Sequence, residues 1–271
     1  MDISIRRFGR AGREMVGVMQ HAAAGRRPRA AFLLCRPLGQ EAIRTSAMFR
    51  ALADRLAREG CTVLRFDYHG TGDSPGDEGM QSMALWAEDL LAAHELLLRE
   101  DPQCPVHWFG MGLGGNIAAR AAARATVAPR HAVLWEPVLD GQGYMRDLLA
   151  SHRSELSREL GLEWHQVLRR KREEEPSLPG VVLGFHVGAP LTEELRQLKE
   201  LPLSPAARRG VKLTCAVTKD QQEAMHIAQK HLGEALRLHV VETRTNWMST
   251  EALGTAIVPQ DVPRTLLATL Q

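Results

Sequence analysis

The segment "HWFGMGLGGNIAA" at residues 107–119 decides how this chain is interpreted. An apolar run ends in a glycine-dense turn, and an alanine-rich segment of helical character follows. This order predicts a strand, a sharp turn and a helix, an arrangement that presents one residue at the edge of a sheet. In the pattern G-x-S-x-G, that residue is a nucleophilic serine. Here the central position is Gly112, which has no side chain.

Apolar runs and amphipathic segments alternate along most of the chain. The runs predict strands at residues 29–35, 61–67, 106–110, 131–137, 211–218 and 236–243. The segments between and after them predict helices at 45–60, 83–100, 115–125, around 221–235 and at 263–271. Strands that alternate with helices favour a mostly parallel sheet with helices on both faces. Sites in such sheets lie at the carboxyl ends of the strands.

Residues 138–206 interrupt this alternation. They are charged and helical in character, and they contain Pro176 and Pro179 before a second apolar stretch. We interpret them as an insertion that lies over the strand ends as a largely helical cap. Because no repeat or low-complexity linker separates the segments, residues 1–271 are predicted to form a single α/β domain.

Composition restricts the classes of partner. The 271 residues carry a formal net charge of +2, and no basic stripe with interleaved aromatic residues follows the cluster of N-terminal arginines. We therefore interpret them as a solvated surface and predict no binding of nucleic acid. No stretch approaches the ~20 apolar residues that a membrane span needs. The first thirty residues contain many arginines and no sustained apolar run, so we expect a cytoplasmic protein.

The four cysteines are far apart in the sequence. Cys35, Cys61, Cys104 and Cys215 form no C-x-x-C motif and lie in or beside apolar runs. This spacing predicts buried free thiols in a reducing compartment, with neither a disulfide framework nor a metal site. We also predict no cofactor.

Three loops resemble those of a known family. "CRPLGQE", "RFDYHGTGDSPGD" at residues 65–77 and "GMGLGG" occur in the order found in the α/β-hydrolase fold, and the similarity covers nearly the whole chain. The loop at 65–77 is similar to that of serine-aminopeptidase-like hydrolases, especially hydrolases associated with exosortase gene clusters. "PLGQEAIRT" and "GFHVGAPLTEEL" indicate the same branch. The resemblance implies a catalytic triad in the chain order Ser, Asp or Glu, His.

Carrying the triad over position by position gives a degenerate set. The serine position is Gly112, and Asp220 follows the strand after which the acid is expected. The histidine position falls on Asn246 or Trp247, and no histidine follows His239. Since the elbow residue is held at positive φ, glycine there relieves roughly 1 kcal/mol of strain. We interpret the pattern as a natural loss of the triad.

Other groups near the predicted strand ends offer alternatives. His69 is the alternative base, although a histidine that organises its loop is commoner. Cys35 is a candidate nucleophile, but a buried apolar thiol is the simpler interpretation. His186 in the insertion and Glu136 after a strand are further pocket candidates. Asp67, Asp73 and Ser74 are expected to hold their loop through hydrogen bonds.

These observations lead to a hypothesis and its alternatives. We predict a pocket beneath the cap, and its lining residues are Leu38, Gly39, His69, Met111, Gly112 and Leu113. The first hypothesis is a non-hydrolytic binder, a pseudoenzyme of a biosynthetic pathway that takes an acyl or ester-like small molecule or a pathway partner. The alternative is an active hydrolase, lyase or acyltransferase that uses a non-standard group. A third interpretation is an interaction subunit, bound to another protein or to a second copy as a homodimer.

Overall fold

An eight-stranded sheet forms the centre of the computed structural model, which describes residues 2–22, 27–161, 178, 180–241, 247 and 259–271. Its strand order is β1-β2-β4-β3-β5-β6-β9-β10. Strands β1 and β2 are antiparallel to each other, β2 is antiparallel to β4, and every pair from β4 to β10 is parallel. The prediction of a mostly parallel sheet is confirmed.

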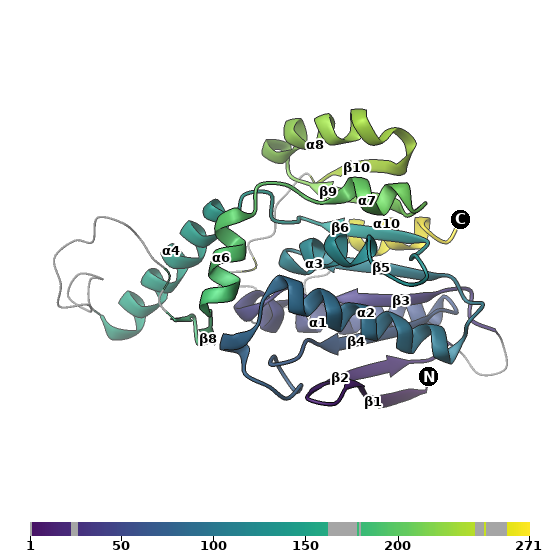
Figure 1. Ribbon diagram of the computed structural model, residues 1–271, viewed down its shortest axis with the longest axis horizontal. Coiled ribbons are helices and arrows are strands. Elements are labelled where there is room, and N and C mark those ends of the chain that lie inside the picture. Colours follow the sequence, from purple (N-terminus) through teal and green to yellow (C-terminus); the bar gives the residue numbers. More distant parts are fainter. Residues whose placement is uncertain (1, 23–26, 162–177, 179, 242–246, 248–258) are drawn as a thin grey trace.

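The strands match the apolar runs closely. Their bounds are β1 Ile3–Arg10, β2 Arg13–Gln20, β3 Ala31–Cys35, β4 Thr62–Asp67, β5 Val106–Met111, β6 His131–Trp135, β9 Lys212–Val217 and β10 Leu236–Val240. In Figure 1 the N-terminal hairpin and β10 lie at opposite edges of the sheet. Every residue of β3 and β5 is buried, which is why both read as unbroken apolar runs.

Helices cover both faces of the sheet. On one face lie α2 Met83–Glu100, α3 Leu113–Ala122, α7 Leu203–Arg208 and α8 Lys219–Leu232, whose buried side chains share one hydrophobic cluster. On the other face, α1 Gly39–Arg58 and α10 Asp261–Ala268 pack in a second cluster. Both faces of the central strands are therefore removed from water, as the alternating pattern predicts.

The insertion lies beyond the carboxyl ends of the strands. Between β6 and β9 it contains α4 Gly141–Leu160, a short hairpin of β7 Val181–Val182 and β8 Phe185–His186, and α6 Ala189–Gln197. Figure 1 shows α4, β8 and α6 together at one end of the sheet. The helical cap of the predicted fold class is thus present, and its limits at 138 and 206 stay a prediction. Among the described residues, no helix is long and apolar enough to cross a membrane.

The N-terminal hairpin is an element that the sequence interpretation omitted. Its arginines were expected on a solvated surface, and Arg7 and Arg10 are indeed exposed. Arg13 is different, because its side chain is only 12% exposed and forms a bidentate ion pair with Asp89 of α2. One of the N-terminal charges therefore attaches the hairpin to the rest of the domain.

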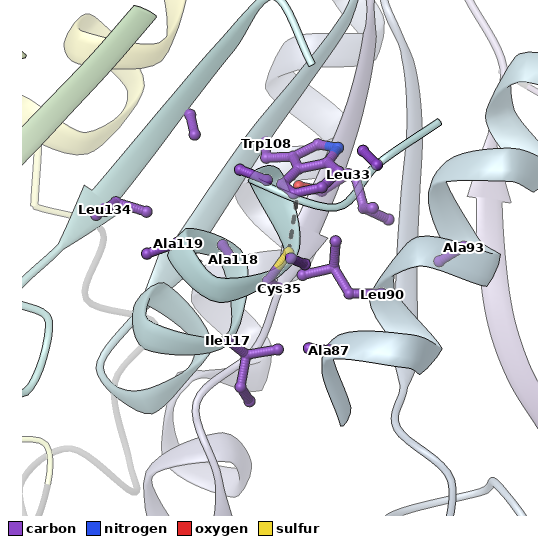
Figure 2. Packing of buried hydrophobic residues seen from close by; sticks show 14 of the residues in the cluster. Leu33, Cys35, Ala87, Leu90, Ala93, Trp108, Ile117, Ala118, Ala119 and Leu134 are labelled. Atoms are coloured by element: carbon purple, nitrogen blue, oxygen red, sulfur yellow. Dashed lines mark hydrogen bonds between the residues drawn. The ribbon is translucent and has the colours of Figure 1, made fainter. Parts of the chain in front are cut away.

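Close approach of α3 to the sheet explains the density of glycine in residues 110–115. A Cβ atom on Gly114 would lie 2.4 Å from the carbonyl oxygen of Arg36 and 2.5 Å from that of Cys35, distances that no real Cβ tolerates. Figure 2 shows the consequence, with Ala118 of α3 beside Cys35 and with Leu90 of α2 on the other side of Cys35. Small side chains let the helix lie directly on the strands.

All four cysteines are buried and unpaired, as the sequence predicted. Burial raises the pKa of the Cys35 thiol strongly, and it raises those of Cys61 and Cys104 to about 11 and that of Cys215 to about 12. Thiols with such pKa values hold their protons at neutral pH and are poor nucleophiles. Cys35 is therefore not an activated nucleophile in this structure.

Two stacked histidines make the stability of the domain depend on pH. The rings of His107 and His131 lie 6.4 Å apart at 15°, and burial, followed by neighbouring positive groups, lowers both pKa values to about 4. In the unfolded chain a histidine has a pKa of about 6.5. The unfolded state therefore binds more protons, so stability is complete above about pH 6.5 and falls as the pH drops towards 4.

We expect urea unfolding to show a loss of about 2 kcal/mol or more for each of these histidines between pH 7 and pH 4. His107→Phe should flatten this dependence. His231→Phe, at an exposed histidine of α8, is the matched control and should leave it unchanged. A pH dependence that is the same in both variants would contradict the assignment.

Candidate active site

The elbow between β5 and α3 is built around Gly112. Its backbone has φ 54° and ψ −129°, a conformation that side chains disfavour and glycine adopts readily. The Gly112 N–H donates to the carbonyl of Trp135 at 3.0 Å, and the Gly112 carbonyl accepts from the N–H of Gly115 at 2.9 Å. The predicted elbow is present, and the residue at its tip offers only backbone groups.

A carboxylate lies where the elbow side chain would begin. A Cβ atom built on Gly112 would lie 3.1 Å from Oε2 of Glu41 and 3.5 Å from Cβ of Pro37. Glu41 belongs to the first turn of α1, which starts at Gly39 within the segment "CRPLGQE" at residues 35–41. Sequence reasoning missed Glu41, because only the fold brings the start of α1 over the end of β5.

A small apolar cavity, which we call the elbow cavity, lies between the start of α1 and the insertion. It has ≈ 40 Å³ of room for water-sized molecules, enough for a few waters or a thin apolar group. Its lining includes Leu38, Gly39, Glu41, Glu78, Leu113, Tyr144, His186, Val187 and Leu191. Three of the predicted lining residues, Leu38, Gly39 and Leu113, are among them.

Two other predicted lining residues lie elsewhere. The ring Nδ1 of His69 lies 3.0 Å from the carbonyl oxygen of Glu14, and the backbone N–H of His69 donates to Asp89. The loop after β4 therefore turns His69 towards the N-terminal hairpin and away from the elbow. Met111 is buried in the hydrophobic cluster beneath α1, because alternate residues of β5 point to opposite faces.

The loop after β4 is held by Asp67 and Ser74, two of the three residues predicted to do so. Asp67 forms an ion pair with Arg36 and accepts from the backbone N–H of Asp73 at 3.1 Å. The Ser74 hydroxyl donates to the carbonyl of Asp67 at 2.6 Å and accepts from the backbone N–H of Val16 at 2.9 Å. The side chains of Asp67 and Ser74 thus fix the loop and its contact with the hairpin, and Asp73 contributes its backbone N–H.

Two glutamates attach the insertion to the domain. Glu78 accepts from the backbone N–H of His186 at 2.9 Å, and burial raises the pKa of its carboxyl group. Glu194 of α6 accepts from backbone N–H groups at the start of α2 and pairs with Arg120 of α3 at 2.7 Å. His186 consequently lies at the mouth of the elbow cavity.

The structure describes two of the remaining triad positions, Asp220 and Trp247. Asp220 lies in the first turn of α8 and is exposed. Asn246 lies outside the described residues. Trp247 is described and is 5% exposed, packed in the cluster that contains α1. Within the described part of the chain, no group of three His, Cys, Asp or Glu side chains could hold a metal ion.

Glu136 lies at the mouth of the sheet, directly after β6. It has φ 45°, an uncommon value for a residue with a side chain, and its N–H donates to the carbonyl of Ala216 at 2.8 Å. Its strained backbone is thus held by β9, and β6, the strand that Glu136 follows, is the neighbour of β5, which carries the elbow.

Comparison with known proteins identifies the fold and the family. The family model described as serine aminopeptidase, S33, matches residues 27–232. No curated protein matches this chain in sequence.

Similar solved structures agree on the fold. They include a carboxylesterase of the ammonia-oxidizing thaumarchaeon Nitrososphaera gargenis, 15% identical with a TM-score of 0.62, covering 98% of this chain and 97% of that one. A thermostable carboxyl esterase of Bacillus coagulans is 14% identical with a TM-score of 0.63, over 99% and 97%. A proline iminopeptidase of Mycobacterium smegmatis is 13% identical with a TM-score of 0.63, over 98% and 97%. At such identities the likeness establishes the α/β-hydrolase fold alone.

Proposed function

The chain belongs to the serine aminopeptidase S33 family of α/β-hydrolase-fold proteins, and on that premise we propose that it is a non-hydrolytic binder of an acyl or ester-like small molecule. The observation that carries the proposal is the elbow, where Gly112 supplies no hydroxyl and a carboxylate oxygen of Glu41 lies 3.1 Å from the place of a Cβ. Acyl transfer by a serine needs a nucleophile, and it needs groups that stabilise the negative charge of the tetrahedral intermediate. Neither group present at this elbow provides that chemistry.

The lining of the elbow cavity supports a ligand that is mainly apolar. Leu38 directly precedes α1, Leu113 begins α3, and Val187 and Leu191 come from the insertion. Ligand sites are typically apolar clefts with a few polar groups that orient the ligand. Here Tyr144 supplies a hydroxyl that stays protonated, because burial and the nearby Glu41 raise its pKa.

We also propose a cytoplasmic location and a place in a biosynthetic pathway, with a partner protein or a second copy as the alternative occupant. Support for the location comes from the four buried, unpaired cysteines, a pattern typical of reducing compartments.

A substitution in the cavity wall tests the binding proposal. We expect native mass spectrometry of the purified protein to detect a bound acyl or ester compound, and saturation-transfer NMR to detect binding of methyl hexanoate. Val187→Phe should weaken methyl hexanoate binding about tenfold, since overpacking a site costs about 1–3 kcal/mol. Val127→Phe makes the same change at a residue that is 53% exposed and does not line the cavity, and it should bind normally. Equal affinities in both variants would contradict the proposal.

One observation favours a second candidate, an enzyme that works without the serine. Glu41 holds a carboxylate oxygen beside the elbow, where it can accept a proton from a bound water. The two candidates differ in a simple assay. Turnover of p-nitrophenyl butyrate by the wild type that Glu41→Gln abolishes would favour the enzyme, and no turnover is expected for the binder.

A further inference from the structure

A groove far along the sheet from the elbow carries an unusual set of polar residues. It lies between β10 and α10, on the face of the sheet that carries α10. We call it the β10–α10 groove. Its floor is formed by His131, Thr214, Arg237 and His239 from three neighbouring strands. With ≈ 270 Å³ of room for water-sized molecules, it is much larger than the elbow cavity.

The wall of the groove comes from α10. Arg264, Thr265 and Thr269 of this helix line it opposite the strands. Arg264 faces Asp261 one turn earlier, but its Nη1 lies 3.8 Å from Oδ1, which is too long for a hydrogen bond. The guanidinium of Arg264, whose side chain is 75% exposed, therefore has donors to offer a ligand.

The charges around the groove are mainly positive. Arg237 and Lys212 act on His131 closely enough to lower its pKa, and Arg130 acts on the stacked His107 in the same way. Asp261 is the one acidic residue that the described ion pairs bring to a residue of this groove. An anionic ligand would be attracted by this field, while a cationic one would be repelled.

His239 provides an independent sign of a ligand. It lines the groove, and its ring packs against Trp135 with 5.9 Å between the centroids. Its Nε2 atom is buried and has no hydrogen-bond partner in the described structure. A buried polar atom without a partner is costly, and a rotation of the His239 ring towards the groove would let a ligand oxygen satisfy it.

We propose that the β10–α10 groove binds the phosphoryl group of a small molecule. A strand and a helix each contribute one arginine to the groove, so a ligand must offer acceptor oxygens in more than one direction. A tetrahedral phosphoryl group does so, whereas a carboxylate directs both oxygens from one plane. Arginine forks and hydroxyl groups are standard partners of phosphate. This site is separate from the elbow cavity and independent of the function proposed for it.

Isothermal titration calorimetry with inorganic phosphate at low salt tests the proposal. We expect binding by the wild type, weaker binding of acetate, and a loss of phosphate affinity of about tenfold in Arg237→Gln and in Arg264→Gln. Arg196→Gln is the matched control, because Arg196 also pairs with an acidic residue one turn earlier on an exposed helix. Absence of phosphate binding by the wild type, or an equal loss in the control, would overturn the proposal. Both groove arginines are exposed, so their replacement should leave the circular dichroism spectrum unchanged.

Vesicles distinguish a lipid headgroup from a free phosphate compound as the source of the phosphoryl group. If a lipid is the ligand, phosphatidylglycerol vesicles should sediment the wild type but not Arg237→Gln, and phosphatidylcholine vesicles should sediment neither. If a soluble phosphate compound is the ligand, calorimetry should show binding and neither vesicle should sediment the protein. Vesicle binding that survives both arginine substitutions would overturn the groove as the site.

Discussion

Asp89→Ala is expected to lower the free energy of unfolding by about 3–5 kcal/mol, as is typical when one partner of a buried ion pair is removed. The Asp89 side chain is 0% exposed, and Arg13 donates to it through Nε at 2.6 Å and through Nη2 at 2.9 Å. The backbone N–H of His69 donates to the same carboxylate at 3.0 Å. Removing the carboxylate would leave a largely buried cation and an N–H group without their partner.

A surface pair of the same residue types provides the control. Arg27 and Asp101 approach to 3.2 Å with side chains that are 59% and 26% exposed. Such exposed pairs contribute about 0–1 kcal/mol, so Asp101→Ala should cost far less than Asp89→Ala. Urea unfolding of both variants gives the comparison. If Asp89→Ala cost less than about 1 kcal/mol, the hairpin would not depend on this pair.

The Arg13–Asp89 pair also shows why the N-terminal hairpin was not predicted. Local periodicity in the sequence predicts helices α1 and α2 and the central strands. Their predicted bounds lie within a few residues of those observed, apart from the start of α1. In β1 the apolar residues are interrupted by arginines, and β2 begins with Arg13 and Glu14, so the local pattern resembles a charged surface. The partner that neutralises Arg13 lies 76 positions away, and no local pattern reveals it.

In the candidate site, too, local sequence predicts some features, whereas contacts between distant elements determine the others. The positive φ of Gly112 follows from the local glycine-rich turn, and the sequence was sufficient to predict the elbow. The direction of His69 depends on its contact with Glu14 in the hairpin, which the sequence interpretation lacked. The approach of Glu41 to the elbow depends on how the first turn of α1 packs over β5. Contacts between elements distant in sequence thus decide which groups face the cavity.

Gly112→Ser is expected not to restore hydrolysis of p-nitrophenyl acetate or butyrate. A serine hydroxyl is a weak nucleophile at neutral pH until a base takes its proton. At the elbow the new side chain would meet Glu41, whose Oε2 lies 3.1 Å from the Cβ position. A carboxylate is a poorer general base than the imidazole of a triad, and it offers no hydrogen-bond donor to the negative charge that develops on the substrate oxygen.

A serine protease without its triad retains a rate acceleration of about 10³–10⁴ over the reaction in water. A residual rate of this size is too low for ordinary ester assays to detect. Gly112→Ser should also cost about 1 kcal/mol of stability, since it places a side chain at positive φ. Gly112→Ala is the matched control, because it carries the same strain without a hydroxyl.

The double variants separate the two missing contributions. Gly112→Ser with Asn246→His supplies a base while retaining Asp220, and Gly112→Ser with Glu41→Gln removes the charge beside the nucleophile. We expect the first to have the better chance of turnover, because deprotonation of the hydroxyl precedes any stabilisation of the product anion. Robust turnover by Gly112→Ser alone, above that of Gly112→Ala, would mean that a base already faces the elbow. Glu41, Glu78 and His186 are the candidate bases that line the adjoining cavity, and such a result would place this protein among the enzymes of its fold.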